Sequence, residues 1–235
     1  MTISQQWVET AGLRGYFCKR DTQSPALLVF MEAFGLNNHI QSVCQRLAEA
    51  GYSALAPDFF RGETYAYTQV DKAIAKISSL DQMNLMDEAK TWLEFLAQDP
   101  TIITESLGVI GFCFGGRLAF LANAVLKEKT SIAISFYGGG IGPKSSMHGM
   151  PSLLDRVPFM QSPIFLFYGA DDPMILPNEH SNIAKALSDH KKRYSMHVFP
   201  NAGHGFFCEE RESYSPEAAK KAWALVLHHL QEAWG

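Results

Sequence analysis

The chain has 235 residues, of which 47% are hydrophobic and 19% charged, and its formal net charge is −4. This composition is typical of a globular protein and excludes a disordered chain. Because the sequence has no basic stripe and no long run of one charge sign, we expect it to bind neither nucleic acid nor a membrane surface.

The sequence predicts a single domain over residues 1–235, since it contains no repeat, low-complexity stretch or long linker. No apolar run approaches the roughly 20 residues that span a bilayer. Residues 1–7 lack the cationic segment and apolar stretch of a signal peptide, so we expect a cytoplasmic protein. No two of the four cysteines form a Cys-x-x-Cys pair, and we expect reduced thiols.

Short apolar runs alternate along the chain with stretches of helical periodicity. Strands are predicted at 27–31, 53–56, 107–110, 131–136, 164–168 and 194–199, and helices at 40–50, 83–97, 114–127 and from Ser215-Pro216 onward. This alternation predicts an α/β fold with a mostly parallel sheet covered by helices on both faces. Residues 138–161 fit neither period and are expected to form loops or short helices over the functional site.

Residues 111–115, Gly-Phe-Cys-Phe-Gly, lie between a predicted strand and a predicted helix. The Gly-x-Cys-x-Gly pattern matches a nucleophile elbow with cysteine in place of serine. The strained central residue requires small neighbours, and the helix N-terminus favours a thiolate on Cys113. The alternative interpretation is a plain packing turn, but its position between strand and helix favours the nucleophile.

An acid and a histidine follow the elbow in the order that such enzymes use. Asp171 and Asp172 follow the strand predicted at 164–168, and His204 lies in a Gly-His-Gly segment after the last predicted strand. His204 would accept the proton of Cys113, and a carboxylate would orient the imidazole. We favour Asp172 as that carboxylate, with Asp171 as the alternative, and we expect the loop around His204 to be flexible and exposed.

The other histidines have no comparable context, and no His-x-x-x-His or Cys/His spacing indicates a metal. We therefore predict neither a metal nor another cofactor.

The segment Gly111-Phe-Cys113-Phe-Gly-Gly-Arg117 resembles the nucleophile segment of the dienelactone hydrolases, also called carboxymethylenebutenolidases, within the α/β-hydrolase superfamily. Residues 31–37, 56–62, the acid turn and residues 203–206 also resemble segments of that family, in the same order. The resemblance implies an eight-stranded, mostly parallel sheet and a Cys-His-Asp triad.

The resemblance also assigns roles to residues near the nucleophile. It implies an oxyanion hole formed by the backbone N–H groups of Phe114 and Ala33, the first of which agrees with elbow geometry. It implies that Glu32 lies near the thiol and takes part in its activation. From the residues alone, the alternative for Glu32 is a strand-end carboxylate in solvent, but the apolar run that precedes it favours a partly buried role.

The chain departs from the family in its substrate arginines. Cys208 stands four residues after His204, where an arginine that binds the substrate carboxylate is expected, and Arg211 is out of register. We therefore expect a neutral ester or lactone in place of dienelactone. The expected apolar pocket is lined by Phe34, Tyr137 and Phe206, and also by Phe207 and Met150.

The sequence thus predicts a hydrolase of small carboxylic esters or lactones that acts through a thioester, as a monomer or a homodimer. Two alternatives stay open: another hydrolase on the same triad, such as one that attacks phosphotriesters or carbon–halogen centres, and a non-catalytic ligand-binding protein on a hydrolase scaffold.

Overall fold

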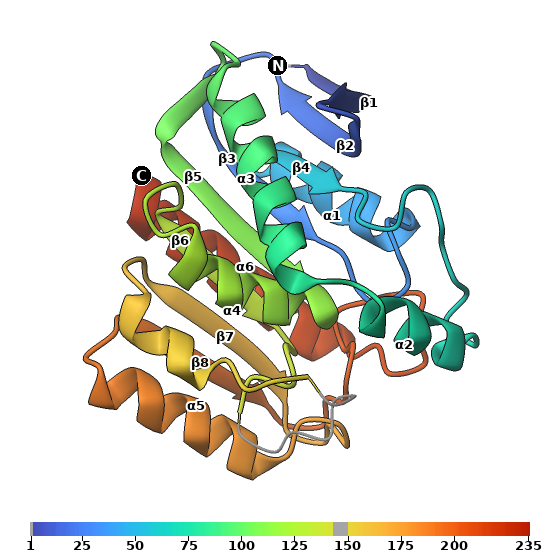
Figure 1. Cartoon of the computed structure of the whole chain (residues 1–235), viewed down its shortest axis with the longest axis vertical. Coiled ribbons are helices and arrows are strands. Elements are labelled where there is room, and N and C mark those ends of the chain that lie inside the picture. Colours follow the sequence, from blue (N-terminus) through green and yellow to red (C-terminus); the bar gives the residue numbers. More distant parts are fainter. Residues whose placement is uncertain (1, 143–149) are drawn as a thin grey trace.

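Eight strands form one sheet in the order β1-β2-β4-β3-β5-β6-β7-β8 (Figure 1). The structure, a computed structural model, describes residues 2–142 and 150–235. The strands are β1 Ile3–Thr10, β2 Leu13–Arg20, β3 Ser24–Phe30, β4 Ser53–Pro57, β5 Ile102–Phe112, β6 Ile132–Phe136, β7 Ile164–Gly169 and β8 Tyr194–Phe199. β1 pairs antiparallel with β2 and β2 with β4, whereas all pairs from β4 across to β8 are parallel. The predicted eight-stranded, mostly parallel α/β sheet is confirmed.

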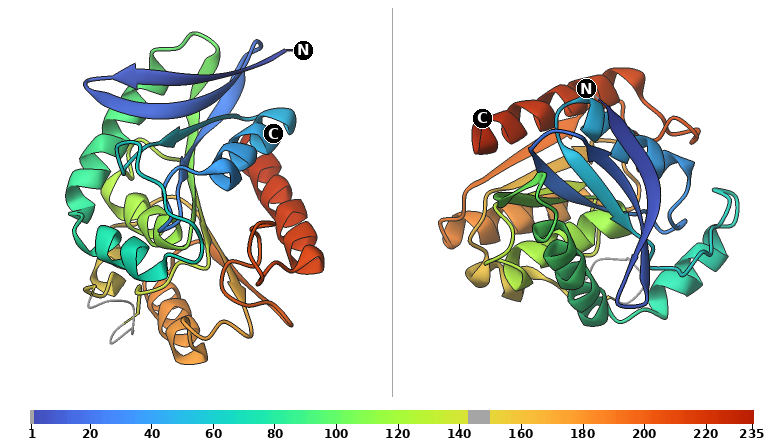
Figure 2. Two further views of the ribbon diagram at one scale, coloured as in Figure 1. Left: turned by 90° about the vertical axis from the view of Figure 1, so that its right-hand side faces the viewer. Right: turned by 90° about the horizontal axis from the view of Figure 1, so that it is seen from above.

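Helices cover both faces of the sheet. They are α1 Asn38–Glu49, α2 Val70–Ser78, α3 Gln82–Ala97, α4 Phe114–Val125, the 3-10 helix η1 Leu154–Phe159, α5 Pro177–Asp189 and α6 Pro216–Trp234. Figure 2 shows α1 and α6 on one face, with α3 and α4 on the other. Every residue of β4 and β6 is buried, as expected for parallel strands between two helical layers.

The sequence did not predict the β1–β2 hairpin or the helices α2 and α5. β1 carries the polar stretch Ser4-Gln5-Gln6 and is half-buried or exposed along its whole length, so it lacks the apolar run of a central strand. Ala11 and Gly12 join the two strands with φ values of 49° and 74°, the backbone of a tight hairpin turn.

Side chains cap the N-termini of two of the helices. Asn37 accepts a hydrogen bond from the backbone N–H of Ile40, and Asp81 accepts from those of Met83 and Asn84, which satisfies N–H groups at the start of α1 and α3. Ser215 occupies the position before α6, but its side chain makes no capping bond there. The predicted start of that helix is confirmed, and the predicted serine cap is not formed.

The strand ends define where a site can lie. Because β3 to β8 run parallel, the residues that follow β3, β5, β6, β7 and β8 all emerge at the same edge of the sheet.

The segment 138–161 was expected to form loops or short helices. Part of it lies outside the described residues, and residues 154–159 form η1.

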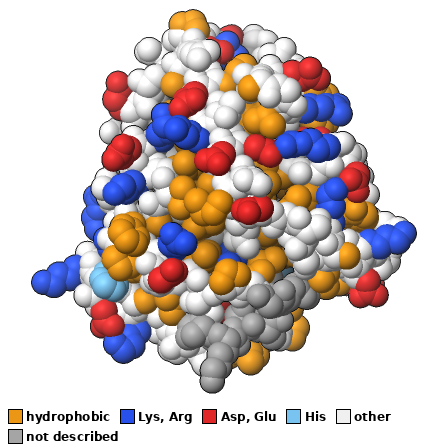
Figure 3. Space-filling view, viewed as in Figure 1, with side chains coloured by type: hydrophobic (Ala, Val, Ile, Leu, Met, Phe, Trp, Pro, Cys, Tyr) orange, Lys and Arg blue, Asp and Glu red, His pale blue; other side chains and the backbone are white. Residues whose placement is uncertain are grey.

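Two further findings concern the surface and the helices. On the face drawn in Figure 3, basic and acidic side chains are interspersed and neither sign gathers into a large patch. None of the helices within the described ranges is long and apolar enough to cross a bilayer.

Candidate active site

Cys113 lies on a sharp turn between β5 and α4. Its backbone has φ 54° and ψ −115°, a conformation that a residue with a side chain rarely adopts. A Cβ on Gly111 would lie 1.9 Å from the carbonyl oxygen of Gly115, and a Cβ on Gly115 would lie 2.2 Å from that of Phe30. Both positions therefore require glycine, and the turn has the shape of a nucleophile elbow.

Three side chains form a continuous hydrogen-bonded chain at the sheet edge. Cys113 Sγ lies 3.2 Å from His204 Nε2, and His204 Nδ1 lies 2.8 Å from Asp172 Oδ2. The other oxygen of Asp172 accepts hydrogen bonds from the backbone N–H groups of Met174 and Ile175. The elements that place these residues are β5, β7 and β8, whose carboxyl ends they follow.

The carboxylate beside His204 is that of Asp172, the residue favoured from the sequence. Asp172 is buried, whereas Asp171 is exposed. The neighbouring aspartate therefore lies in solvent and makes no hydrogen bond or ion pair with His204 within the described structure.

Charge and burial act in opposite directions on the imidazole. Burial lowers the pKa of His204, but the negative charge of Cys113 and the hydrogen bonds with Asp172 and Cys113 outweigh burial and raise that pKa above its ordinary value. The arrangement therefore favours the imidazolium form of His204, the form that donates a proton to a leaving group.

The loop around His204 differs from the flexible, exposed loop that the sequence suggested. His204 is only 6% exposed, and Ser213 Oγ donates a 2.6 Å hydrogen bond to its carbonyl oxygen. Gly205 has φ +79°, and a Cβ there would lie 2.4 Å from the guanidinium of Arg211. Gly205 thus permits close packing beside the histidine, and the prediction of exposure was wrong.

The two expected oxyanion donors follow adjacent parallel strands. Phe30 of β3 pairs with Gly111 of β5, so Ala33 and Phe114 emerge from neighbouring positions at the sheet edge. Phe114 is the first residue of α4, and the first N–H groups of a helix have no acceptor within it. Their role as oxyanion donors stays a prediction.

Glu32 is fully buried, which excludes the interpretation as a solvent-exposed strand-end carboxylate. Its Oε1 accepts hydrogen bonds from the hydroxyl of Tyr137 and from Nη1 of Arg211, each at 3.4 Å. Burial raises the pKa of Tyr137 well above its ordinary value, and the negative charge of Glu32 adds to that rise, so the phenol remains a donor.

Arg211 lies in the site although the sequence placed it out of register. Its guanidinium lies 5.6 Å from the ring centres of Phe34 and of Tyr67, in addition to its ion pair with Glu32. The contact spans 179 positions of the chain, so no local sequence signal could have found it.

A pocket of about 590 Å³ lies beside His204. Its lining residues are Tyr67, Thr68, Pro173, Met174, Gly203, His204, Glu210, Arg211, Glu212 and Ser213. Within the described residues, Phe34, Tyr137 and Phe206 are not part of this lining, nor are Phe207 and Met150. An apolar pocket formed by those five residues stays a prediction.

Two of the aromatic residues that were expected in the pocket, Phe206 and Phe207, lie in the core. Phe206 packs against Phe136 and Tyr137, with ring centres 6.2 and 5.5 Å apart, and Phe207 stacks on Phe112 at 5.5 Å. Both are fully buried, so they support the site from the core. The ring of Tyr137 lies 5.2 Å from that of His204.

Arg117 and Glu179 hold the segment that follows β6. The buried guanidinium of Arg117 donates to the carbonyl oxygens of Gly140 and Pro151, and Glu179 Oε1 accepts from the backbone N–H groups of Ile141 and Gly142. Neither residue had a predicted role. The signal available for Arg117 was a charge placed within an otherwise apolar stretch, Gly115-Gly116-Arg117-Leu118-Ala119.

Comparison with known proteins agrees with this geometry. The model of the "Dienelactone hydrolase family" matches residues 13–234. A Synechocystis protein named "Putative carboxymethylenebutenolidase" is 30% identical over 217 residues, which cover 89% of this chain and 86% of the relative. A Bradyrhizobium protein named "Probable 2-oxo-3-(5-oxofuran-2-ylidene)propanoate lactonase" is 30% identical over 209 residues, covering 88% and 83%.

Solved structures give the same picture. The "Putative Dienelactone Hydrolase" from Klebsiella pneumoniae superposes with a TM-score of 0.86 at 26% identity, covering 98% of each chain. A dienelactone hydrolase-like promiscuous phosphotriesterase from metagenomic libraries shares the fold, with a TM-score of 0.83 at 23% identity over 99% of each chain. The chain therefore belongs to the dienelactone hydrolase family, within the α/β-hydrolase fold, and is a hydrolase of ester or lactone bonds.

Proposed function

We propose that the chain hydrolyses small carboxylic esters or lactones through a thioester on Cys113. The observation that carries this proposal is the continuous contact from Cys113 Sγ through His204 to Asp172, with donor–acceptor distances of 3.2 and 2.8 Å. The nucleophile contacts its base, and the base contacts the carboxylate that orients it, as the proposed roles require.

The first half of the reaction forms the acyl-enzyme. The sulfur of Cys113 attacks the carbonyl carbon, and the C=O electron pair moves to oxygen, where the N–H groups of Phe114 and Ala33 stabilise it. Donors of this kind contribute about 3 kcal/mol each in comparable enzymes. The carbonyl then reforms, the C–O bond to the leaving group breaks, and His204 gives the leaving oxygen a proton.

The second half releases the acid. His204 removes a proton from water, the resulting hydroxide attacks the thioester carbon, and the C–S bond breaks to return the thiolate. Asp172 keeps Nδ1 of His204 protonated and stabilises the imidazolium in both halves. For a lactone, the leaving oxygen stays attached to the same molecule, so the product is a hydroxy acid or its tautomer.

The pocket beside His204 indicates where the rest of the substrate lies. Arg211 combines an ion pair to Glu32 with contacts to Phe34 and Tyr67, and it lines the pocket next to His204. We propose that Arg211 faces a polar or acidic substituent of the ester, and that Glu32, whose position Arg211 and Tyr137 fix, takes part in activating the thiol.

The proposal is tested with a panel of neutral and carboxylate-bearing esters, lactones and phosphotriesters. We expect turnover of at least one ester or lactone by the unmodified chain and its loss in Cys113→Ala. Cys18→Ala is a matched control, because Cys18 is a buried thiol on β2 outside the site. Mass spectrometry of a quenched reaction should show the acyl group on the peptide that contains Cys113.

The outcomes distinguish the alternatives. Ester hydrolysis at unchanged rate in Cys113→Ala would contradict the proposed nucleophile. Turnover confined to phosphotriesters would replace the carboxylic ester with a phosphate ester as the substrate. Alkylation of Cys113 with no turnover across the panel would favour a ligand-binding protein.

A further inference from the structure

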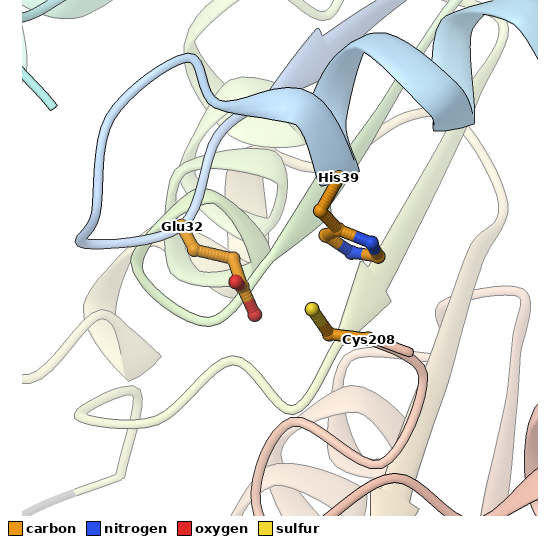
Figure 4. Close-up of side chains that lie close together, drawn as sticks. All are labelled: Glu32, His39 and Cys208. Atoms are coloured by element: carbon orange, nitrogen blue, oxygen red, sulfur yellow. The ribbon is translucent and has the colours of Figure 1, made fainter. Parts of the chain in front are cut away.

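A second cluster of a carboxylate, an imidazole and a thiol lies beside the active site. Glu32 follows β3, His39 lies in the first turn of α1, and Cys208 belongs to the loop after His204. One ligand atom from each residue lies within 4.8 Å of the other two. Figure 4 shows the three side chains pointing toward one another from three separate segments of the chain.

The polar atoms of this cluster are buried and incompletely paired. Glu32 and Cys208 are fully buried, and His39 is 6% exposed. Glu32 Oε1 is bonded to Tyr137 and Arg211, but Glu32 Oε2 and His39 Nε2 have no hydrogen-bond partner within the described structure. Burial of an unsatisfied carboxylate oxygen costs several times RT, so an unpaired oxygen aimed into the cluster indicates a ligand that supplies the missing bond.

We propose that Glu32, His39 and Cys208 form a binding site for a thiophilic divalent cation, with zinc as the best match. Carboxylate oxygen, imidazole nitrogen and thiolate sulfur are the three ligand types that zinc prefers. Three protein ligands leave a fourth tetrahedral position, which water can fill. This inference does not depend on the proposed hydrolysis.

The charges of the cluster suit a dication. The carboxylate of Glu32 and the thiolate of Cys208 together balance the two positive charges of the ion. The only cation that directly contacts the cluster in the described structure is Arg211, and it bonds to Oε1 of Glu32, which leaves Oε2 available.

Metal binding changes the protonation of the cluster. The ion takes the lone pair of a neutral imidazole and a thiolate sulfur. Binding therefore breaks the S–H bond of Cys208, forms the sulfur–metal bond and releases one proton to solvent.

Tyr67 lies between the cluster and solvent. Its hydroxyl lies 3.1 Å from Cys208 Sγ and accepts a 2.9 Å hydrogen bond from Asn37 Nδ2. Tyr67 and Glu210 line two surface pockets, of about 590 and 490 Å³. Both pockets that Tyr67 lines therefore also carry an acidic side chain, that of Glu210.

The active site holds a competing set of soft ligands, since Cys113 and His204 also offer sulfur and nitrogen. The experiment therefore uses the full chain with Cys113→Ala, which leaves Cys208 as the thiol nearest to any bound ion. The chain is first treated with a chelator and then titrated with Co²⁺, whose charge-transfer band in the near ultraviolet appears only when a thiolate is a ligand. Zn²⁺ is added afterwards to displace the cobalt.

We expect one Co²⁺ per chain to produce the thiolate band in Cys113→Ala, and Zn²⁺ to abolish it. Adding Cys208→Ala should remove the band, and adding His39→Gln should weaken binding by at least about 100-fold, since replacing even the partner of a ligand costs 10–100-fold. The matched controls, Cys18→Ala and His190→Gln in the same Cys113→Ala background, should keep the band, because both residues lie outside the cluster.

Two results would overturn the proposal. One is a Cys113→Ala chain that shows no thiolate band at millimolar Co²⁺, and the other is a band that persists after Cys208 is replaced. If Cys208→Ala fails to fold by circular dichroism, X-ray absorption of the zinc-loaded Cys113→Ala chain decides the question. One sulfur at about 2.3 Å from the ion supports the site, and no sulfur or two sulfurs contradict it.

Discussion

Two groups of side chains each combine a thiol, an imidazole and a carboxylate, and they differ in how their atoms are paired. In the first group, His204 bonds to Cys113 with one nitrogen and to Asp172 with the other, and the second oxygen of Asp172 accepts two backbone hydrogen bonds. In the second group, formed by Glu32, His39 and Cys208, one oxygen and one nitrogen are buried without a partner among the described residues.

This difference in pairing corresponds to a difference in chemistry. In a row of hydrogen bonds from thiol to imidazole to carboxylate, the imidazole can give a proton to a leaving group and take one from water, as nucleophilic catalysis requires. Three ligand atoms that lie close together, without bonds to one another, are arranged for a central ion. The same three functional groups therefore serve proton transfer or cation binding according to their mutual orientation.

The largest expected effect concerns the acid of the first group. Asp172→Asn should lower kcat/KM for an ester substrate by about 10³–10⁴, since an amide stabilises the wrong tautomer of the histidine. Asp171→Asn should change it by no more than about twofold, because that exposed side chain lies outside the hydrogen-bonded chain. Steady-state kinetics of both variants measure the contrast, and equal losses would remove Asp172 from its proposed role.

The second largest expected effect is a difference in reactivity between Cys113 and Cys208. The pKa of Cys208 is raised to about 11 by burial and the charge of Glu32, so at pH 7 only about one molecule in 10⁴ carries the thiolate. Cys113 faces an imidazole whose pKa is raised. We expect iodoacetamide to modify Cys113 at least about 100-fold faster at pH 7.

The pH dependence sharpens this contrast. Because a raised thiol pKa keeps the sulfur neutral below it, modification of Cys208 should accelerate about tenfold for each pH unit toward 11. Peptide mass spectrometry measures the labelling of each cysteine separately. The labelling rate of Cys208 in Cys113→Ala shows whether modification of Cys113 alters the reactivity of Cys208. Labelling of Cys113 and Cys208 at similar rates at pH 7 would contradict the proposed difference in reactivity between the two groups.

Arg211 lies between the two groups, and its charge should matter for some substrates more than others. Arg211→Gln should lower kcat/KM by about 10–100-fold for an ester that carries a carboxylate, because a hydrogen bond to a charged group contributes about 1.5–3 kcal/mol. A neutral ester should lose less than about threefold, since it has no charge to pair.

A surface arginine provides the control for that substitution. Arg61 pairs with Glu88 with half of its side chain exposed, so Arg61→Gln should affect both substrate classes equally and slightly. Equal losses for charged and neutral esters in Arg211→Gln would mean that Arg211 acts through Glu32 and does not contact the substrate.

The sequence predicted the first group and missed the second, for a physical reason. Elbow glycines, the acid turn and the histidine each follow a strand, and strand ends at one sheet edge are brought together by the fold itself. The pairing of Glu32 with Arg211, and the approach of His39 to Cys208, depend on how a loop packs against a helix start. Sequence periodicity contains no information on that packing.

Other predictions failed, or remain open, for related reasons. Phe206 and Phe207 were assigned to the pocket because they adjoin His204 in sequence, but a loop places successive side chains in different directions, and both entered the core. The polar strand β1 lacks the apolar signal by which the central strands were recognised. A single domain, a cytoplasmic location and a monomeric or homodimeric state stay predictions.

The smallest expected effect tests the residue that touches both groups. Tyr137 donates a 3.4 Å hydrogen bond to Glu32, and its ring lies beside that of His204. Tyr137→Phe removes the hydroxyl and keeps the ring, so the packing of His204 is retained while Glu32 loses one donor. Since a neutral hydrogen bond contributes about 0.5–1.5 kcal/mol, kcat/KM for an ester should fall by about 2–10-fold.

Steady-state kinetics of Tyr137→Phe measure the effect on hydrolysis, and cobalt titration of Tyr137→Phe in the Cys113→Ala background measures the effect on cation binding. The cobalt affinity of Tyr137→Phe should stay within about threefold of that of the parent chain. Tyr137 bonds to Oε1 of Glu32, whereas the proposed ligand of the ion is Oε2. A loss of cobalt binding as large as that in His39→Gln would instead place Tyr137 among the groups that hold the ion, and the two groups would then have to be described as one site.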